Sequence, residues 1–164
     1  MKILDGPASA TGSARGIAER ITAGLDSAGH DVGLQSCADI AEVNDYEVVP
    51  GSAIHNRQWL PAAADMIDRL RSHLEAKVVW AFSVPSAGTR STILSPRVAN
   101  ELRRVIPEPR VVQRLRAPAD VRDHRLFAGA TAYGTCHYRD TGGRPDTDRW
   151  TGAVRAEAPR GERR

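Results

Sequence analysis

The chain has 164 residues, of which 41% are hydrophobic and 26% are charged, and its formal net charge is +3. These values predict one soluble domain with a sizeable core and exclude a membrane span, which needs ~20 consecutive apolar residues. The N-terminus has no signal-peptide pattern, and two cysteines, Cys37 and Cys136, make no disulfide framework, so a cytoplasmic protein is expected. The arginines after residue 96 are interleaved with acidic residues and lack stacking aromatics, so no nucleic-acid partner is expected.

Short apolar runs alternate with helical patterns from the N-terminus onward. Residues 1–4 predict a strand, and apolar residues at a spacing of four then predict a helix that ends at Gly29. The following segments predict a weak strand at 31–35, a short helix or loop at 36–45 and a third strand at 46–53.

The second half continues the alternation, with residues 84–123 giving the weakest pattern. Pro61 lies in the first turn of the next helix, where its missing N–H matters least, and Trp59 and Trp80 are expected in the core. The later elements are a helix at 58–76, a fully covered strand at 77–83, a helix at 99–106, a fifth strand at 124–132 and a helix at 146–158.

Five strands alternating with helices predict an α/β domain with a parallel sheet covered on both faces. The domain is expected over residues 1–157, followed by a disordered basic tail at 158–164.

Small polar residues cluster after three of the predicted strands. They occur in "SATGSA" after the first strand, "GSAIHNRQW" after the third and "SVPSAG" after the fourth. In a five-stranded sheet of order 2-1-3-4-5 these strands are adjacent, so their loops converge at the carboxyl edge, where ligands bind. The first loop combines hydroxyl groups, a glycine and a helix N-terminus, which suit a phosphate group.

The same segments resemble the flavodoxins. "SATGSA" is similar to their phosphate loop, and "ASATGSARGIAERI", "YEVVPGSAIHNRQWLPAA", "VVWAFSVPS" and "VRDHRLFAG" resemble short flavodoxin-domain proteins related to menaquinone-dependent protoporphyrinogen oxidase. The resemblance implies a flavodoxin-like three-layer α/β/α sandwich that binds FMN. It also implies an oxidoreductase or electron-transfer function, with a quinone or a reductase as redox partner.

Carried onto this sequence, the resemblance implies three groups of FMN-binding residues and neither a catalytic side chain nor a metal ligand. The phosphate would be held by Ser9, Thr11, Gly12, Ser13, Ala14 and Arg15. One side of the isoalloxazine ring would be flanked by Ser52, Ala53, Ile54, His55 and Asn56. The other side would be lined by Ser83, Val84, Pro85, Ser86 and Gly88.

Four residues depart from the family pattern and predict a weakened site. Asp5 falls in an expected apolar strand, where burial would shift its pKa or deform the strand. Pro7 and Pro50 remove backbone donors, and Ala14 lacks the hydroxyl of its relatives. The alternative function is therefore a degenerate flavodoxin fold with a weakened or empty site that serves as a binding or structural module. A second alternative is a hydrolase that uses Asp5.

Overall fold

A computed structural model describes residues 1–75, 77–85, 107–127 and 152 of the chain. Its elements in chain order are β1 (Lys2–Ala8), α1 (Ser13–Asp26), β2 (Asp31–Leu34), β3 (Glu47–His55), β4 (Gln58–Trp59), α2 (Pro61–Arg69), the 3₁₀ helix η1 (Arg71–Leu74), β5 (Val78–Pro85), α4 (Arg110–Leu115) and β6 (Asp120–Leu126). The helices expected at 99–106 and 146–158 and the expected tail at 158–164 lie outside the described residues.

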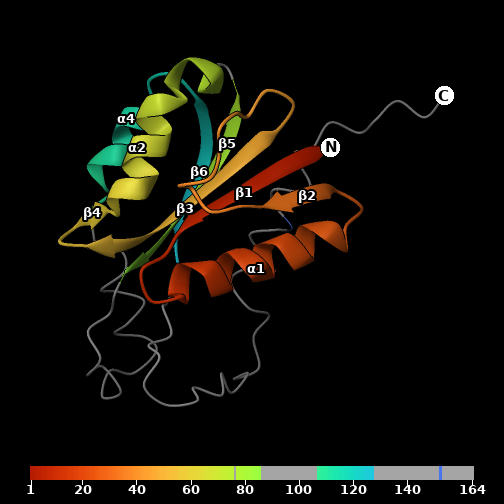
Figure 1. The fold of residues 1–164 in the computed structure, drawn as a ribbon, viewed down its shortest axis with the longest axis horizontal. Coiled ribbons are helices and arrows are strands. Elements are labelled where there is room, and N and C mark those ends of the chain that lie inside the picture. Colours follow the sequence, from red (N-terminus) through yellow and green to blue (C-terminus); the bar gives the residue numbers. More distant parts are fainter. Residues whose placement is uncertain (76, 86–106, 128–151, 153–164) are drawn as a thin grey trace, which may run out of the picture.

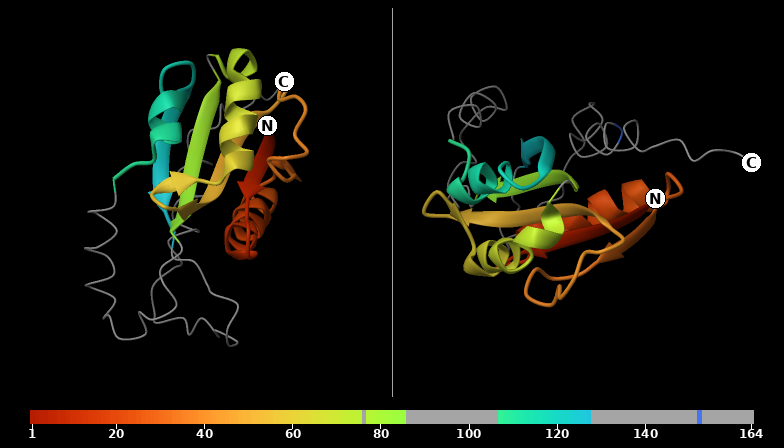
Figure 2. Two further views of the ribbon diagram at one scale, coloured as in Figure 1. Left: turned by 60° about the vertical axis from the view of Figure 1, so that its left-hand side comes forward. Right: turned by 90° about the horizontal axis from the view of Figure 1, so that it is seen from above.

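The strands form one sheet that is covered on both faces. Five of them are parallel in the order β2-β1-β3-β5-β6, and the short β4 pairs with β3 in the antiparallel direction. Helix α1 covers one face, and α2 and α4 cover the other (Figures 1 and 2). The predicted three-layer α/β/α architecture and its strand order are confirmed, with β5 and β6 as the fourth and fifth parallel strands.

The elements differ from the prediction at several points. Residues 36–45 form turns and loop, the second of the two expected possibilities, and α2 ends at Arg69, with η1 following. Helix α4 was not predicted, because its six residues follow two prolines and are too few to show a helical period. Strand β6 begins at Asp120, four residues before the expected fifth strand.

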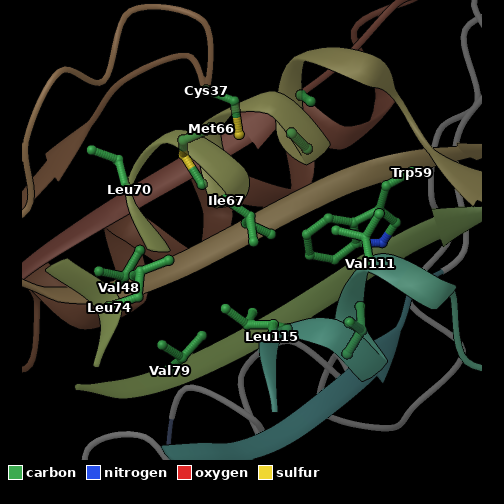
Figure 3. Packing of buried hydrophobic residues seen from close by; sticks show 14 of the residues in the cluster. Cys37, Val48, Trp59, Met66, Ile67, Leu70, Leu74, Val79, Val111 and Leu115 are labelled. Carbon is green, nitrogen blue, oxygen red and sulfur yellow. The ribbon is translucent and has the colours of Figure 1, made fainter. Parts of the chain in front are cut away.

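Two hydrophobic clusters stabilise the layers, one on each face of the sheet. The α1-face cluster includes Ile21, Trp80 and Phe82, all buried beneath or beside α1. The α2/α4-face cluster includes Trp59 and Leu115, and Figure 3 shows these side chains gathered between the two helices and β5. Both tryptophans expected in the core are therefore confirmed there.

Strand β1 runs through Pro7 without interruption. The carbonyl of Pro7 accepts the amide N–H of Cys37 at 3.2 Å, so the ring nitrogen also faces the β2 side of the strand. The last paired residue of β2 is Leu34, opposite Asp5, so Pro7 lies beyond the end of β2 and removes no bond to β3.

Strand β3 also continues through its proline, Pro50, but its pairing with β5 is interrupted there. The register passes from Val48 opposite Val79 directly to Gly51 opposite Phe82, so the ladder skips Val49 and Pro50. The expected loss of a backbone donor in a central strand is thus visible as a local gap in the ladder.

Gly51 lies beneath the aromatic ring of Phe82 on the neighbouring strand. A Cβ atom added at Gly51 would lie 2.0 Å from Phe82 Cζ, well inside van der Waals contact. Phe82 in turn meets Phe127 edge to face, with ring centroids 6.0 Å apart. The absence of a side chain at Gly51 therefore lets an aromatic pair cover this part of the sheet.

Two titratable groups are buried beside β1. Asp5 is fully buried on the α1 face, where Thr22 Oγ1 donates to its Oδ2 at 3.3 Å and its Oδ1 has no partner among the described residues. Burial raises the pKa of Asp5 well above its ordinary value, while the strand stays regular. On the other face, the Cys37 thiol donates to the carbonyl of Gly6 at 3.0 Å, and burial raises its pKa to about 12.

Candidate functional site

The turn between β1 and α1 presents unused hydrogen-bonding groups at the carboxyl edge of the sheet. Ser9 Oγ is buried and has no partner among the described residues. Gly12, the N-cap of α1, has φ 89°, a left-handed conformation that glycine adopts without strain. A Cβ atom added at Gly12 would meet nothing within 4 Å, so the space in front of it is open.

The N-terminus of α1 completes an anion-binding arrangement. No side chain in the described part of the molecule caps the helix, and its first turn holds no acidic residue. The amide of Gly16 donates to Gly12 O at 2.9 Å, and the amides of the first turn before it have no carbonyl to bond within the helix. Free amides and the positive end of the helix dipole favour an anion here.

The other residues predicted to bind phosphate differ in their exposure to solvent. Thr11 is exposed and Ser13 is half-buried, whereas the Ala14 side chain is fully buried in the α1-face cluster. Arg15 is exposed and pairs with Glu19 at 3.0 Å. Ala14 can therefore serve an anion through its backbone N–H only.

A tight hairpin joins β3 to β4 at the same edge. His55 pairs with Gln58, and the two residues between them, Asn56 and Arg57, have φ of 50° and 64°. Two successive left-handed residues define a type I′ turn, which asparagine adopts readily and arginine much less so. His55, Asn56 and Arg57 are all exposed, and Arg57 was not among the predicted site residues.

The other predicted residues of β3 and β5 lie inside the strands. Ala53 and Val84 face the α1 cluster, and Ile54 faces the α2/α4 cluster. Pro85 is half-buried at the end of β5, opposite Ile54, while Ser86 and Gly88 lie outside the described residues.

Ser52 and Ser83 turn their hydroxyls away from the edge and into the interior. They lie opposite each other on β3 and β5, and both are fully buried. Ser52 Oγ accepts the amide N–H of Leu60 at 2.9 Å and donates to the carbonyl of Ala53 at 2.8 Å. Ser83 Oγ accepts the indole N–H of Trp59 at 2.7 Å. The two serines thus fasten the end of the hairpin to the sheet.

The Ser83 hydroxyl also reaches a histidine that the sequence did not single out. His124 Nε2 lies 2.8 Å from Ser83 Oγ, and His124 Nδ1 lies 3.5 Å from Glu108 Oε1. Glu108 is itself paired with Arg116 at 2.8 Å. Burial lowers the pKa of His124, and the Glu108 carboxylate opposes that shift in part. Alternation along β6 gives no clear signal for His124, because the strand has an irregularity after Val121 that puts Val121 and His124 opposite residues of the same sheet face.

The described residues do not support a hydrolase site at Asp5, a metal site or a membrane-spanning helix. Asp5, the nucleophile of the hydrolase alternative, is sealed beneath α1, so that alternative is wrong. No group of three His, Cys, Asp or Glu side chains among the described residues is arranged to hold a metal ion. None of the helices in the described ranges is both long and apolar enough to cross a membrane.

Comparison with known proteins identifies relatives of this fold. The sequence model of the family described as "Flavodoxin domain" matches residues 8–140. A flavodoxin from the domain Archaea superposes with a TM-score of 0.56 at 21% identity, covering 78% of this chain and 85% of that one. Megasphaera elsdenii flavodoxin gives 0.62 at 15% identity, over 95% and 99% of the two chains. The flavodiiron protein of Giardia intestinalis gives 0.52 at 19% identity, over 79% of this chain and 31% of that protein. No protein of curated function matches the sequence.

Proposed function

Because this chain belongs to the flavodoxin-domain family, we propose that it binds FMN at the carboxyl edge of its sheet and transfers electrons through it. The observation that carries the proposal is the buried Ser9 hydroxyl, which has no partner among the described residues and lies beside the uncapped N-terminus of α1. A buried polar atom without a hydrogen-bond partner is unfavourable unless a ligand supplies one, and the adjacent helix N-terminus offers N–H donors to the same ligand.

The residues present fit the phosphate of FMN. Ser9 would donate its hydroxyl, the first-turn amides of α1 would donate their N–H groups, and Gly12 leaves open space where any side chain would intrude. Arg15 adds a positive charge on the exposed side. Ala14 contributes no hydroxyl, which removes one contact and leaves the rest of the arrangement intact.

The hairpin would flank the isoalloxazine ring with His55 and Asn56, the two exposed residues of the predicted group. Bound FMN would supply one- and two-electron redox chemistry, and the protein would supply binding, orientation and electrostatics. In this proposal Arg57, at the hairpin tip, adds a second exposed positive charge near the edge. The Megasphaera elsdenii neighbour is described in a two-electron reduced state, which accords with a redox role for this fold.

A narrower function rests on the sequence resemblance alone. In it, the protein would use bound FMN to oxidise protoporphyrinogen, with a quinone as the electron acceptor. Substrate-dependent reduction of the reconstituted flavin under anaerobic conditions tests that hypothesis, with a reductase as the alternative partner.

Titration of FMN with purified protein tests the proposed site, with quenching of flavin fluorescence as the signal. Ser9→Ala is expected to weaken binding by roughly tenfold or more, because a hydrogen bond to a charged group contributes about 1.5–3 kcal/mol. Gly12→Val should abolish binding, because it strains the left-handed turn and fills the open space. Ser72→Ala, an exposed serine of η1, is the matched control and should leave the dissociation constant unchanged.

The competing function is a binding or structural module that has lost its cofactor. Its supporting observation is the set of departures at Asp5, Ala14 and Pro50, of which Pro50 does interrupt the sheet ladder. A folded protein that binds no FMN at about 1 mM would favour this function. If the unmodified protein, Ser9→Ala and Gly12→Val bind FMN with equal affinity, the cofactor binds at another site.

A further inference from the structure

A chain of hydrogen bonds crosses the interior from the β3–β4 hairpin to the surface beside α4. It runs from the Trp59 indole to the Ser83 hydroxyl at 2.7 Å and from Ser83 to His124 Nε2 at 2.8 Å. The other ring nitrogen, His124 Nδ1, lies 3.5 Å from Oε1 of the Glu108 carboxylate. Trp59 and Ser83 are buried and the His124 side chain is 7% exposed, so water competes little for these bonds.

The number of protons on each group determines which atom donates in each of these hydrogen bonds. The indole N–H can only donate, so Ser83 Oγ accepts from Trp59 and has one proton left to donate. His124 Nε2 is the acceptor within reach, which requires a neutral imidazole with its proton on Nδ1. That proton is on the side of the Glu108 carboxylate, and the Trp59–Ser83 and Ser83–His124 bonds are both formed in this tautomer.

Protonation of His124 breaks this arrangement. Nε2 then becomes a donor, and Ser83 Oγ faces two donors at once, the imidazolium and the indole. Its own buried proton is left without an acceptor among the described residues, and a buried donor without a partner is unfavourable. Trp59 lies in a two-residue strand at the end of a hairpin, so a rearrangement of the Ser83 hydroxyl reaches the hairpin through the bond to the Trp59 indole.

We propose that His124 is a positioning residue for the cofactor site, holding the β3–β4 hairpin closed when neutral and releasing it when protonated. The effect on FMN affinity rests on the proposed function, whereas the effect on the hairpin does not. Trp59 pairs with Ile54, only two residues before the exposed tip at Asn56, so movement at Trp59 displaces the turn directly.

Three charged groups surround the imidazole and influence the pH at which His124 is protonated. Glu108 and Arg116 approach from the two ends of α4 and are paired with each other. Asp123, on β6 itself, accepts the backbone N–H of His124 at 2.9 Å. Burial and Arg116 lower the pKa of His124, and Glu108 and Asp123 oppose them, with the net shift downward. The transition therefore lies on the acid side of the ordinary histidine range.

NMR of protein labelled with ¹⁵N-tryptophan tests the role of His124 without any cofactor. The Trp59 indole signal, assigned with Trp59→Phe, should shift between pH 8 and 5 with the same midpoint as the His124 ring protons. The Trp80 indole should not follow that midpoint. A Trp59 signal that stays constant while His124 titrates would overturn the proposal.

Two variants separate positioning from simple structural damage. His124→Gln keeps an acceptor near the position of Nε2 but cannot titrate, so it should preserve the neutral-pH Trp59 signal and abolish its pH dependence. His73→Gln, at an exposed histidine of η1, is the matched control and should keep the pH dependence. If His124→Gln fails to fold, the midpoints measured in the unmodified protein decide the question alone.

FMN affinity then tests the link to the cofactor. Between pH 8 and 5 the unmodified protein should lose about tenfold more affinity than His124→Gln, as one unpaired buried donor implies. The phosphate of FMN titrates identically in both experiments, so the ratio isolates His124. If the Trp59 signal follows the protonation of His124 but the ratio of the two FMN affinities stays constant with pH, the hairpin is not part of the cofactor site. Absence of FMN binding in both proteins would refute the proposed function, while the NMR result would still decide the role of His124.

Discussion

Replacing Asp5 by asparagine is expected to stabilise the protein at neutral pH and to change its stability little in acid. Asp5 is fully buried, with one bond from Thr22 and one oxygen without a partner among the described residues. Its pKa is raised from an ordinary value of 3.8, mainly because burial disfavours the charged form. The folded protein therefore keeps the carboxyl protonated at pH values where the unfolded chain releases that proton.

The sign and the limit of the effect follow from proton linkage. Above pH 3.8 unfolding releases a proton, so the free energy of unfolding falls as pH rises toward the raised pKa of the folded state. One pH unit corresponds to about 1.4 kcal/mol, so the loss between pH 3.8 and 7 reaches at most ~4 kcal/mol. Asparagine is neutral throughout and of nearly the same shape, so Asp5→Asn should recover the stability that the buried carboxyl loses as pH rises.

Urea unfolding followed by circular dichroism measures this difference at pH 4, 5, 6 and 7. The gain of Asp5→Asn over the unmodified protein should be small at pH 4 and grow steadily with pH. Asp39→Asn, at an exposed loop residue, should show no such growth. A gain that is the same at pH 4 and pH 7 would refute the reasoning, because it would show that Asp5 has an ordinary pKa in the folded protein.

Three further substitutions probe the packing of the sheet. Gly51→Ala should destabilise the protein by about 1–3 kcal/mol in urea titration, because its Cβ would overlap the ring of Phe82. Gly16→Ala, in α1 with nothing within 4 Å of the added atom, should instead stabilise it by about 0.5–1 kcal/mol, and the opposite signs are the check. Trp80→Ala should cost ~3 kcal/mol or more, and a loss below about 1 kcal/mol would contradict its burial.

The fold followed from the sequence because its strongest patterns are local. The continuous apolar run of β5 and the four-residue spacing in α1 each mark one buried element, and the alternation of strands and helices leaves few topologies. The elements that were missed or displaced have mixed patterns. Strand β6 is only partly buried and carries charges between its apolar residues, so its start at Asp120 was not visible.

The interior network was not predicted because it depends on which face each serine occupies. Ser52 and Ser83 follow strand ends and carry hydroxyls, which are also the features of a cofactor loop. Alternation along the strand places Ser52 with Val48, and Ser83 with Val79, on the α2/α4 face. The face that each serine occupies can be read from the sequence. The partner of Ser83, His124, and the position of Trp59 cannot, because they depend on where β6 and β4 pair in the sheet.

The buried thiol of Cys37 has a consequence for the chemical durability of the protein. A reduced flavin that meets oxygen generates hydrogen peroxide, and peroxide attacks thiolates rather than thiols. With its pKa at about 12, Cys37 is a thiolate in roughly one molecule in 10⁵ at pH 7. The bond to the Gly6 carbonyl further occupies the S–H group. If the proposed flavin chemistry takes place at the neighbouring edge, this cysteine is kept in a form that peroxide oxidises very slowly, and the packing of β1 survives many turnovers.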